Sequence, residues 1–268
     1  MFEAKVGIIG LGFVGGAIES AFAASHSVDI VRRDPAKGYN ASYNELKECD
    51  AIFVCVPSPQ GDDGSCDTSF LESVLQELDN VGYAGAIISK CTAPPKVYQR
   101  LQEKHSNLVH APEFLTAANA VNDYANGTFA FIGGAVGAYR REAERVIRLS
   151  QPDLNHVYHC TIGEASLAKY TLNTFLATKV IYMNELAELA KSLDCNYTVV
   201  SKMIKADSRI GNSHLQVPGP DGAFGFGGAC FPKDTAALLK IAEEVNIDMN
   251  VLDAAVKKNL MLRLTEPK

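Results

Sequence analysis

The sequence predicts an α/β fold in which a Rossmann-type doubly wound parallel sheet is followed by an all-helical domain. Two observations lead to this prediction. Short apolar runs alternate with helical patterns in the first part of the chain, as they do where helices connect parallel strands. From about His159 onward only helical patterns follow. We therefore expect two domains, at residues 1–158 and 159–268, and a chain of 268 residues that is 47% apolar is long enough to build both.

The expected elements follow from the spacing of apolar residues. The expected strands are Lys5–Ile9, Val28–Val31, Ala51–Val56, Ala86–Ser89, Asn107–His110 and, as the last strand, Phe129–Gly133. The helices between them include Gly16–Ala24, Thr68–Leu78 and Pro95–Glu103. The later helices are expected at Glu164–Leu193, Val199–Lys205, Thr235–Val245 and Val251–Leu264.

A glycine-rich turn, Gly10-Leu-Gly-Phe-Val-Gly15, directly follows the first expected strand and opens the first helix. Its glycines permit a tight turn, and the helix N-terminus offers amide groups and partial positive charge to a pyrophosphate. The pattern alone is weak evidence, but its place between a strand and a helix gives it meaning. We therefore expect a dinucleotide site that includes Gly10, Gly12, Phe13, Val14 and Gly15.

The residues after the second expected strand leave the cofactor open between NAD and NADP. An NAD site usually has Asp or Glu at this point, which accepts hydrogen bonds from the ribose hydroxyls. Here Arg32 occupies that place, and Asp34 follows two residues later. Arg32 and Arg33 could hold the 2′-phosphate of NADP, whereas Asp34 could reach the ribose if the loop bends back at Pro35. A third interpretation is that both arginines belong to a solvated loop.

The stretch Phe224–Thr235 places Cys230 just after a glycine-rich loop and ahead of Lys233 and Asp234. Glycines let the backbone approach a bound ligand closely. The lysine and the aspartate can tune a thiol electrostatically and shuttle its proton. The stretch therefore predicts a nucleophilic cysteine, and the alternative is a glycine turn with a buried, inert thiol.

Composition and charge exclude several classes of function. A net charge of −6 without a long Lys/Arg block argues against nucleic-acid binding. Apolar stretches fall far short of a membrane span, and the first expected strand begins too early for a signal peptide. The seven cysteines are scattered and the histidines lack ligand spacing, so we expect neither a disulfide framework nor a metal site. These features favour a cytoplasmic protein.

Several further motifs follow the glycine turn in a fixed order. They are Val56-Pro-Ser-Pro59 with Asp67, Ser89-Lys-Cys-Thr-Ala-Pro94, Ala111-Pro-Glu-Phe-Leu115, Lys169 with Asn173, Arg209-Ile-Gly211 and Gly225–Thr235. Together they resemble the UDP-glucose/GDP-mannose dehydrogenase family over most of the chain. Recurrence in this order is more specific than any single motif.

The resemblance implies an enzyme that oxidises the primary alcohol of a nucleotide sugar, such as UDP-glucose, to a carboxylate with two NAD+ per turnover. It implies that Asp234 accepts the hydroxyl proton and that Cys230 forms a thiohemiacetal and then a thioester. Lys169 and Asn173 stand four apart on an expected helix and so project from one face. The resemblance gives this pair the role of stabilising the oxyanion.

The last step implied by the resemblance is hydrolysis of the thioester by a water that Glu113 and Thr92 position as base and orienter. The matching positions also extend the expected binding residues. Further cofactor contacts are expected from Val56, Pro57, Thr92 and Lys233. Substrate contacts are expected from Glu113, Phe114, Leu115, Lys169, Asn173, Arg209, Phe224, Gly225 and Gly227.

The chain also departs from the family pattern. It ends before the family's further dinucleotide-like domain, so it is identified as a short member that lacks the nucleotide-sugar-binding domain. Gly127 and Phe129 stand where the family commonly has Pro and Arg. Two alternatives stay open. One is an NADP-dependent β-hydroxyacid or 6-phosphogluconate-like dehydrogenase, which would give Cys230 no role, and the other is a catalytically idle NAD-binding protein.

The last expected helix carries an apolar stripe at helical spacing, which is typical of an interface. The stripe consists of Val251, Leu252, Ala255, Val256, Leu260, Met261 and Leu264. Because relatives pair through their helical segments, the resemblance implies a twofold homodimer packed through residues 165–268. The alternative is a monomer in which the stripe folds back onto the chain's own helices.

Overall fold

The computed structural model describes residues 3–26, 28–116 and 119–264. The chain divides into two compact units. The first comprises Met1–Gly61 and Cys66–Lys169, and the second comprises Asp62–Ser65 and Tyr170–Lys268.

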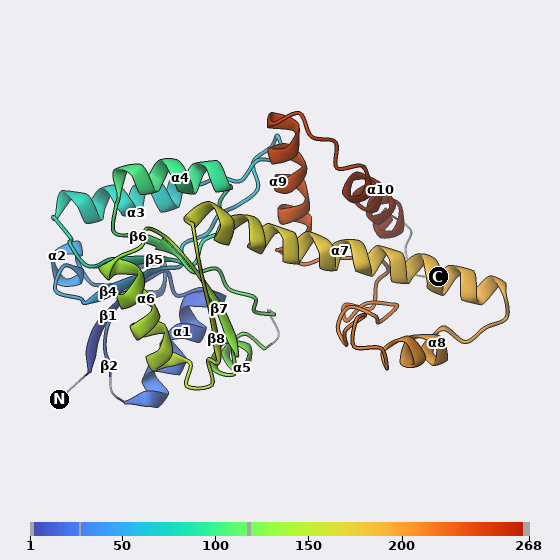
Figure 1. Cartoon of the computed structure of the whole chain (residues 1–268), viewed down its shortest axis with the longest axis horizontal. Coiled ribbons are helices and arrows are strands. Elements are labelled where there is room, and N and C mark those ends of the chain that lie inside the picture. Colours follow the sequence, from blue (N-terminus) through green and yellow to red (C-terminus); the bar gives the residue numbers. More distant parts are fainter. Residues whose placement is uncertain (1–2, 27, 117–118, 265–268) are drawn as a thin grey trace. The chain divides into compact units, whose positions relative to one another are not determined.

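An eight-stranded sheet forms the centre of the first unit (Figure 1). Its strands are β1 (Ala4–Ile9), β2 (Val28–Asp34), β3 (Tyr39–Asn40), β4 (Ala51–Val54), β5 (Ala86–Ser89), β6 (Leu108–His110), β7 (Phe129–Gly133) and β8 (His156–Cys160). They lie in the order β3-β2-β1-β4-β5-β6-β7-β8, and all neighbours are parallel except β2–β3 and β6–β7. The chain starts inside the sheet and winds outward in both directions, so the predicted doubly wound Rossmann-type fold is confirmed.

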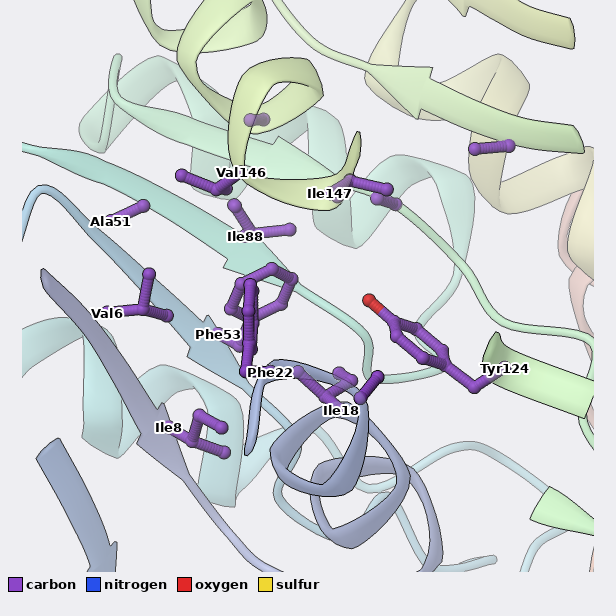
Figure 2. Close-up of a cluster of buried hydrophobic side chains, with 14 of the residues drawn as sticks. Val6, Ile8, Ile18, Phe22, Ala51, Phe53, Ile88, Tyr124, Val146 and Ile147 are labelled. Carbon is purple, nitrogen blue, oxygen red and sulfur yellow. The ribbon is translucent and has the colours of Figure 1, made fainter. Parts of the chain in front are cut away.

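Helices cover both faces of the sheet (Figure 1). They are α1 (Phe13–Ser25), the 3-10 turn η1 (Pro35–Lys37), α2 (Tyr43–Leu46), α3 (Ser69–Asn80), α4 (Pro95–Lys104), α5 (Ala120–Ala125) and α6 (Ala138–Ser150). One apolar core packs α1, α5 and α6 against the sheet, and a second packs α2, α3 and α4 against its other face. In the first core, Figure 2 shows Phe22 of α1 and Ile147 of α6 near Phe53 and Ile88 of the central strands.

Strand β4, in the middle of the sheet, is apolar at every position because both of its faces are covered. In β4, Phe53 belongs to the core under α1 and α6, whereas Ile52 and Val54 belong to the core under α3 and α4. Side chains alternate between the faces of a strand, so a strand buried on both sides reads as a continuous apolar run. Each such side chain contributes on the order of 1.5–3 kcal/mol when fully buried.

The prediction that Phe129–Gly133 is the last strand is wrong, because β8 follows it and pairs with it along its whole length. Strand β8 lies at the edge of the sheet, and its residues are exposed or half-buried. It therefore lacks the apolar run by which buried strands are recognised. Helix α6 lies between β7 and β8 and is rich in arginine and glutamate. Its few buried apolar residues, which include Val146 and Ile147, therefore do not stand out in the sequence.

The second unit is built from helices and loops in its described part, as predicted. Helix α7 (Ile162–Ser192) begins in the first unit and continues into the second, which also contains α8 (Tyr197–Ile204), α9 (Phe231–Glu244) and α10 (Asn250–Leu264). A small apolar core contains Ile181 of α7, Ala255 of α10 and Phe226 of the loop before α9. Within the described ranges, no helix is long and apolar enough to cross a membrane.

Candidate active site

The glycine turn between β1 and α1 has the geometry that the sequence predicts. Gly10 has a φ of +84°, and a Cβ atom there would lie 2.7 Å from the carbonyl oxygen of Cys55. A Cβ atom at Gly15 would lie 1.9 Å from the carbonyl oxygen of Gly10. Helix α1 begins at Phe13 with Gly12 as its N-cap, and no side chain caps its first amides. Val14 follows in the first turn, so these amides are available to an anion such as a pyrophosphate.

Asp34 lies at the end of β2 and reaches back to this turn. Its Oδ2 accepts a hydrogen bond of 2.8 Å from the amide of Leu11. The Lys37 ammonium, which follows in η1, donates to the carbonyl oxygen of Leu11. The turn, the start of α1, Lys37 and residues 119–122 line a cavity of about 520 Å³ in the first unit. The backward bend after Pro35 that would bring Asp34 toward the turn is therefore present.

The two arginines of β2 are held by other groups of the first unit. Arg32 forms an ion pair of 2.5 Å with Glu19 of α1. Arg33 donates to the carbonyl oxygen of Ala41 at 2.7 Å, and its guanidinium lies 4.4 Å from the centre of the Tyr43 ring. Both side chains thus have structural roles. The carboxylate of Asp34 contacts the glycine turn, whereas Arg33 does so only through its carbonyl oxygen, which accepts from the amide of Gly10 at 2.9 Å.

The loops after β4 and β5 meet at the carboxyl edge of the sheet, where ligands bind in doubly wound folds. Val56 and Pro57 follow β4, and Thr92 follows β5. The thiol of Cys91 donates to the carbonyl oxygen of Val56 at 3.3 Å, which ties the two loops together. The carbonyl oxygen of Thr92 accepts from the thiol of Cys66 at 3.2 Å. The predicted cofactor residues of these loops therefore lie at the expected edge.

Glu113 and Lys169 form a buried pair in the first unit. The Lys169 ammonium donates to the carbonyl oxygen of Glu113 at 2.6 Å and lies 3.3 Å from its Oε1. The other carboxylate oxygen of Glu113 accepts from the amide of Leu115 at 2.6 Å. The same ammonium lies 5.2 Å from the centre of the Phe114 ring. The structure thus brings together four of the predicted substrate residues, although the pair are 56 positions apart in the chain.

Asp234, the predicted base of the second unit, is buried, with an exposed fraction of 1%. Its Oδ2 accepts from the side-chain amide of Asn173 at 2.6 Å, and its Oδ1 accepts from the Lys233 ammonium at 2.6 Å. The carboxylate is therefore held between two donors from α7 and α9. Such charge-assisted hydrogen bonds fix its orientation.

Cys230 is exposed and forms the N-cap of α9. Its carbonyl oxygen accepts the amide of Asp234 at 2.8 Å, so the first turn of α9 carries Cys230, Lys233 and Asp234 together. The N-terminal end of a helix stabilises an anion, and a thiolate at this position benefits from it. The alternative interpretation placed Cys230 in a buried position, and on this point it is wrong, because the residue is exposed. Helix α9 begins four residues earlier than the predicted Thr235, at Phe231.

The glycine-rich loop ahead of Cys230 is held by side chains that sequence reasoning missed. The amide of Gly225 donates to Oδ1 of Asn184 at 3.0 Å, and the amide of Phe226 donates to Oδ1 of Asn259 at 2.7 Å. Arg263 donates to the carbonyl oxygens of Phe226 and Gly225 at 3.0 and 3.2 Å. Asn259 and Arg263 stand four apart within the apolar stripe of α10, which is the signal that could have indicated them.

Glycine is favoured in this loop, because Gly225 has a positive φ and the side chains of Asn259 and Arg263 lie where a Cβ atom would be. A Cβ atom at Gly225, where φ is +74°, would lie 2.4 Å from Oδ1 of Asn259. At Gly227 it would lie 2.8 Å from the Arg263 guanidinium. Phe224 at the start of the loop stays partly exposed. Among the predicted substrate residues of this unit, Arg209 stands apart, since its side chain is 87% exposed and pairs with Asp207.

Each unit therefore contributes one chemically coherent set. The first holds a dinucleotide-type turn and a buried Glu113–Lys169 pair beside Phe114. The second holds an exposed thiol at a helix N-terminus, followed by a buried carboxylate with two donors. Thiol, carboxylate, ammonium and amide groups are the types needed for covalent oxidation of an aldehyde followed by hydrolysis.

Family models match both parts of the chain. Residues 36–150 match the NAD binding domain of the UDP-glucose/GDP-mannose dehydrogenase family, and residues 163–260 match its central domain. A UDP-glucose 6-dehydrogenase from Rickettsia conorii is 32% identical over 235 residues, which cover 84% of this chain and 52% of the relative. The chain thus spans about half the length of that relative.

Solved structures share the fold. A UDP-glucose dehydrogenase from Pyrobaculum islandicum superposes with a TM-score of 0.80 at 24% identity, covering 96% of this chain and 68% of the other. A 3-hydroxyisobutyrate dehydrogenase from Mycobacterium tuberculosis superposes with a TM-score of 0.70 at 17% identity, covering 96% and 92%. At these identities the likeness concerns the fold alone.

Proposed function

Because the chain belongs to the UDP-glucose/GDP-mannose dehydrogenase family, we propose that it carries out NAD-dependent oxidation of the primary alcohol of a nucleotide sugar, such as UDP-glucose, to the carboxylate. In this proposal residues 1–158 bind the dinucleotide and residues 159–268 carry the catalytic cysteine. The observation that carries the proposal is the arrangement on α9, where Asp234 lies between Asn173 and Lys233, one turn from the exposed Cys230.

The residues of the first unit fit a nicotinamide dinucleotide. Gly12 and Phe13 offer uncapped amides to the pyrophosphate, and Asp34 lies beside the glycine turn, where an acid accepts hydrogen bonds from the ribose. Arg32 pairs with Glu19, and Arg33 lies against the ring of Tyr43, so both guanidinium groups are less available to a 2′-phosphate. We therefore propose NAD as the cofactor, with NADP as the alternative that the assay below must test. The chemistry supplied by the bound cofactor is acceptance of one hydride in each of two oxidations.

In the first oxidation, the Asp234 carboxylate takes the proton of the substrate hydroxyl, directly or through a water, as the hydride leaves. Its hydrogen bond from Asn173 and its ion pair with Lys233 hold it in one orientation. The Cys230 thiolate then forms a bond to the aldehyde carbon. Lys169 and Asn173, four apart on α7, stabilise the resulting oxyanion with a charge and a hydrogen bond.

Loss of the second hydride from the thiohemiacetal leaves a thioester on Cys230. Glu113 takes a proton from a water that Thr92 orients, and the water oxygen forms the new bond to the acyl carbon. The carbon–sulfur bond breaks, and the thiolate of Cys230 is regenerated. The sum is one alcohol, one water and two oxidised cofactors converted to one carboxylate, two reduced cofactors and three protons.

The experiment that tests this function counts reduced cofactor per substrate consumed. Purified protein is given limiting UDP-glucose, other nucleotide sugars or β-hydroxyacids, each with NAD or NADP, and absorbance of the reduced nicotinamide is followed to completion. Two equivalents per nucleotide sugar support the proposal. One equivalent from a β-hydroxyacid would replace it with the β-hydroxyacid dehydrogenase alternative, and no reduction with any pair would favour an idle NAD-binding protein.

We further propose that the protein acts in the cytoplasm as a homodimer. The scattered cysteines suit a reducing compartment. The expected stripe on α10 is not uniformly exposed. Leu252 and Ala255 are buried, Ala255 in the unit's own core, whereas Val251 and Leu264 are exposed. On α7, Phe175, Tyr182 and Leu189 repeat every seven residues and are 65%, 57% and 53% exposed. A repeat of this kind lines one face of a helix and suits a second copy of the same helix.

A further inference from the structure

The first unit has a second cavity, which borders the one at the glycine turn and shares Asn122 with it. It measures about 460 Å³ and lies among the loop after β6, α5 and the start of β7. Its walls include Lys90, Glu113, Phe114, Asp123, Phe129 and Gln151. This volume is in the range of small-molecule sites. Lys90 has no role in the function proposed above.

The Lys90 side chain is buried in this wall, with an exposed fraction of 8%. Its ammonium lies 5.7 Å from the centre of the Tyr124 ring and 6.0 Å from that of Phe53. Within residues 3–26, 28–116 and 119–264, no hydrogen bond or ion pair to this ammonium is found. Burial lowers the pKa of Lys90 to about 8. Glu113 and Cys55 lie close enough to act on its charge but do not accept a hydrogen bond from it. A buried ammonium without an acceptor is costly, so a ligand that supplies one would be favoured.

Three other polar side chains of the cavity already have partners. Both oxygens of Glu113 are engaged, one by Lys169 and the other by the Leu115 amide. Asp123 accepts from the amide and the hydroxyl of Thr116 at 2.8 and 2.5 Å. Gln151 donates to the carbonyl oxygen of Tyr124 at 2.7 Å. Lys90 is thus the charged side chain of this cavity that lacks a hydrogen-bonding partner among the described residues.

Aromatic rings form the apolar side of the same cavity. Phe114 and Phe129 line it, with ring centres 5.4 Å apart. The ladder continues through Phe131, 5.5 Å from Phe129, to Tyr158, 5.7 Å from Phe131. Flat rings of this kind pack well against an aromatic or sugar ring. A ligand that suits the cavity thus combines a ring with a single negative charge.

We propose that this cavity binds a small ring-containing carboxylate, whose carboxylate pairs with the Lys90 ammonium and whose ring packs against Phe114 and Phe129. A carboxylate fits better than a phosphate dianion, because one cation faces two carboxylates, Glu113 and Asp123, in the same walls. The site shares the Glu113–Leu115 loop with the residues proposed to act on the substrate.

The proposal is tested by binding alone, without cofactor or nucleotide sugar, so its outcome is independent of the function proposed above. Isothermal titration at pH 7 compares two matched pairs of probes, benzoate with benzyl alcohol and D-glucuronate with D-glucose. The first pair represents aromatic acids and the second sugar acids. The variants are Lys90→Met, which keeps length and removes charge, and Lys104→Met, an exposed lysine of α4, as the control.

We expect at least one acid to bind with one-to-one stoichiometry and its neutral partner to bind at least tenfold more weakly. Lys90→Met should weaken the acid at least tenfold, and Lys104→Met should leave it unchanged. Affinity should also fall between pH 7 and pH 9.5, as the Lys90 ammonium loses its proton. The other titratable groups near Lys90 are the carboxylates of Glu113 and Asp123, which line the same cavity, and the thiol of Cys55. Burial raises the pKa of Cys55, so its thiol stays neutral over that range.

Thermal unfolding distinguishes a ligand-binding role of Lys90 from a purely structural one. If Lys90 binds the ligand, Lys90→Met removes an unmatched buried charge, so it should retain or raise the midpoint of thermal unfolding while losing the ligand. A lowered midpoint with unchanged affinity would overturn the proposal. Equal binding of acid and neutral probe, or no binding of either acid at millimolar concentration, would overturn it as well.

Discussion

Asn173 on α7 donates a hydrogen bond of 2.6 Å to Asp234 on α9, and both side chains are buried. The residues are 61 positions apart, so tertiary folding alone creates the contact. The same carboxylate accepts from Lys233 on its other oxygen. This three-residue arrangement links the helix of the proposed oxyanion site to the helix of the proposed nucleophile.

The first prediction concerns that hydrogen bond. Asn173→Ala leaves a buried carboxylate oxygen without its donor, which should lower the free energy of unfolding by about 1–3 kcal/mol. Asn173→Asp should cost more, because two carboxylates would meet at hydrogen-bonding distance and share a proton. Urea unfolding measures both, with the exposed Asn212→Ala as the control. Equal stability of Asn173→Asp and the parent would contradict the observed contact.

The second prediction concerns the nucleophile. Cys230→Ser should slow the second oxidation at least about a hundredfold, since a hydroxyl at neutral pH has very little of the anion that a thiol has. Released aldehyde is trapped with a hydroxylamine, and acid is measured in parallel. Cys195→Ser, which changes an exposed thiol after α7, should behave like the parent. Acid release by Cys230→Ser at the parent rate would refute the covalent route.

The third prediction concerns cofactor choice. If Arg33 has the structural role seen in its contacts with Ala41 and Tyr43, Arg33→Ala should weaken NAD and NADP by similar factors. The dissociation constants are measured by titrating the protein with each cofactor in its reduced form and following the fluorescence of the reduced nicotinamide. A selective loss of NADP binding would instead assign the guanidinium to a 2′-phosphate. Arg100→Ala, in an exposed ion pair with Glu72, provides the control.

The fourth prediction concerns acid sensitivity. His110 at the end of β6 stacks on Tyr98 with ring centres 4.1 Å apart, and burial lowers its pKa to about 3. In the unfolded chain a histidine has a pKa of about 6.5, so between pH 6.5 and 3 the unfolded state binds one more proton. Stability from this residue is therefore present above pH 6.5 and is lost as the pH falls, by about 1.4 kcal/mol per pH unit.

His110→Phe keeps a ring on Tyr98 but cannot bind the proton. The free energy of unfolding, measured by urea at pH 4.5, 5.5 and 7, should therefore fall less steeply with pH in this variant. The difference in slope from the parent should correspond to about one proton. The exposed His156→Gln should retain the slope of the parent. An unchanged slope in His110→Phe would mean that His110 is protonated in the folded protein.

The fifth prediction concerns assembly. A lysine at Phe175 or Tyr182 places a charge in the middle of the exposed stripe on α7, and burying it in an interface is costly. Each variant should shift sedimentation at micromolar concentration from dimer to monomer, and Val136→Lys, at an exposed apolar residue of the first unit, should not. A monomeric parent, unchanged by NAD and a nucleotide sugar, would refute the homodimer.

The sequence by itself was sufficient for the elements with strong periodic or glycine signals. The strand at Ala86–Ser89 was predicted to the residue, and the glycine turn was placed between the correct strand and helix. Both signals are local, because a strand covered on both faces needs apolar residues throughout, and a turn at positive φ needs glycine. The edge strand β8 was missed for the same reason, since an exposed strand has no such requirement.

The site divides in the same way. Its residue types were readable from the sequence, because the chemistry needs a thiol, carboxylates and an ammonium in a recognisable order. Tertiary structure alone decided which partners hold them, such as Lys169 on Glu113, Asn173 on Asp234, and Asn259 beneath the glycine loop. It also decided that Lys90 is buried beside a cavity. Burial and hydrogen bonding depend on distant segments that meet only after folding, and no local pattern records that meeting.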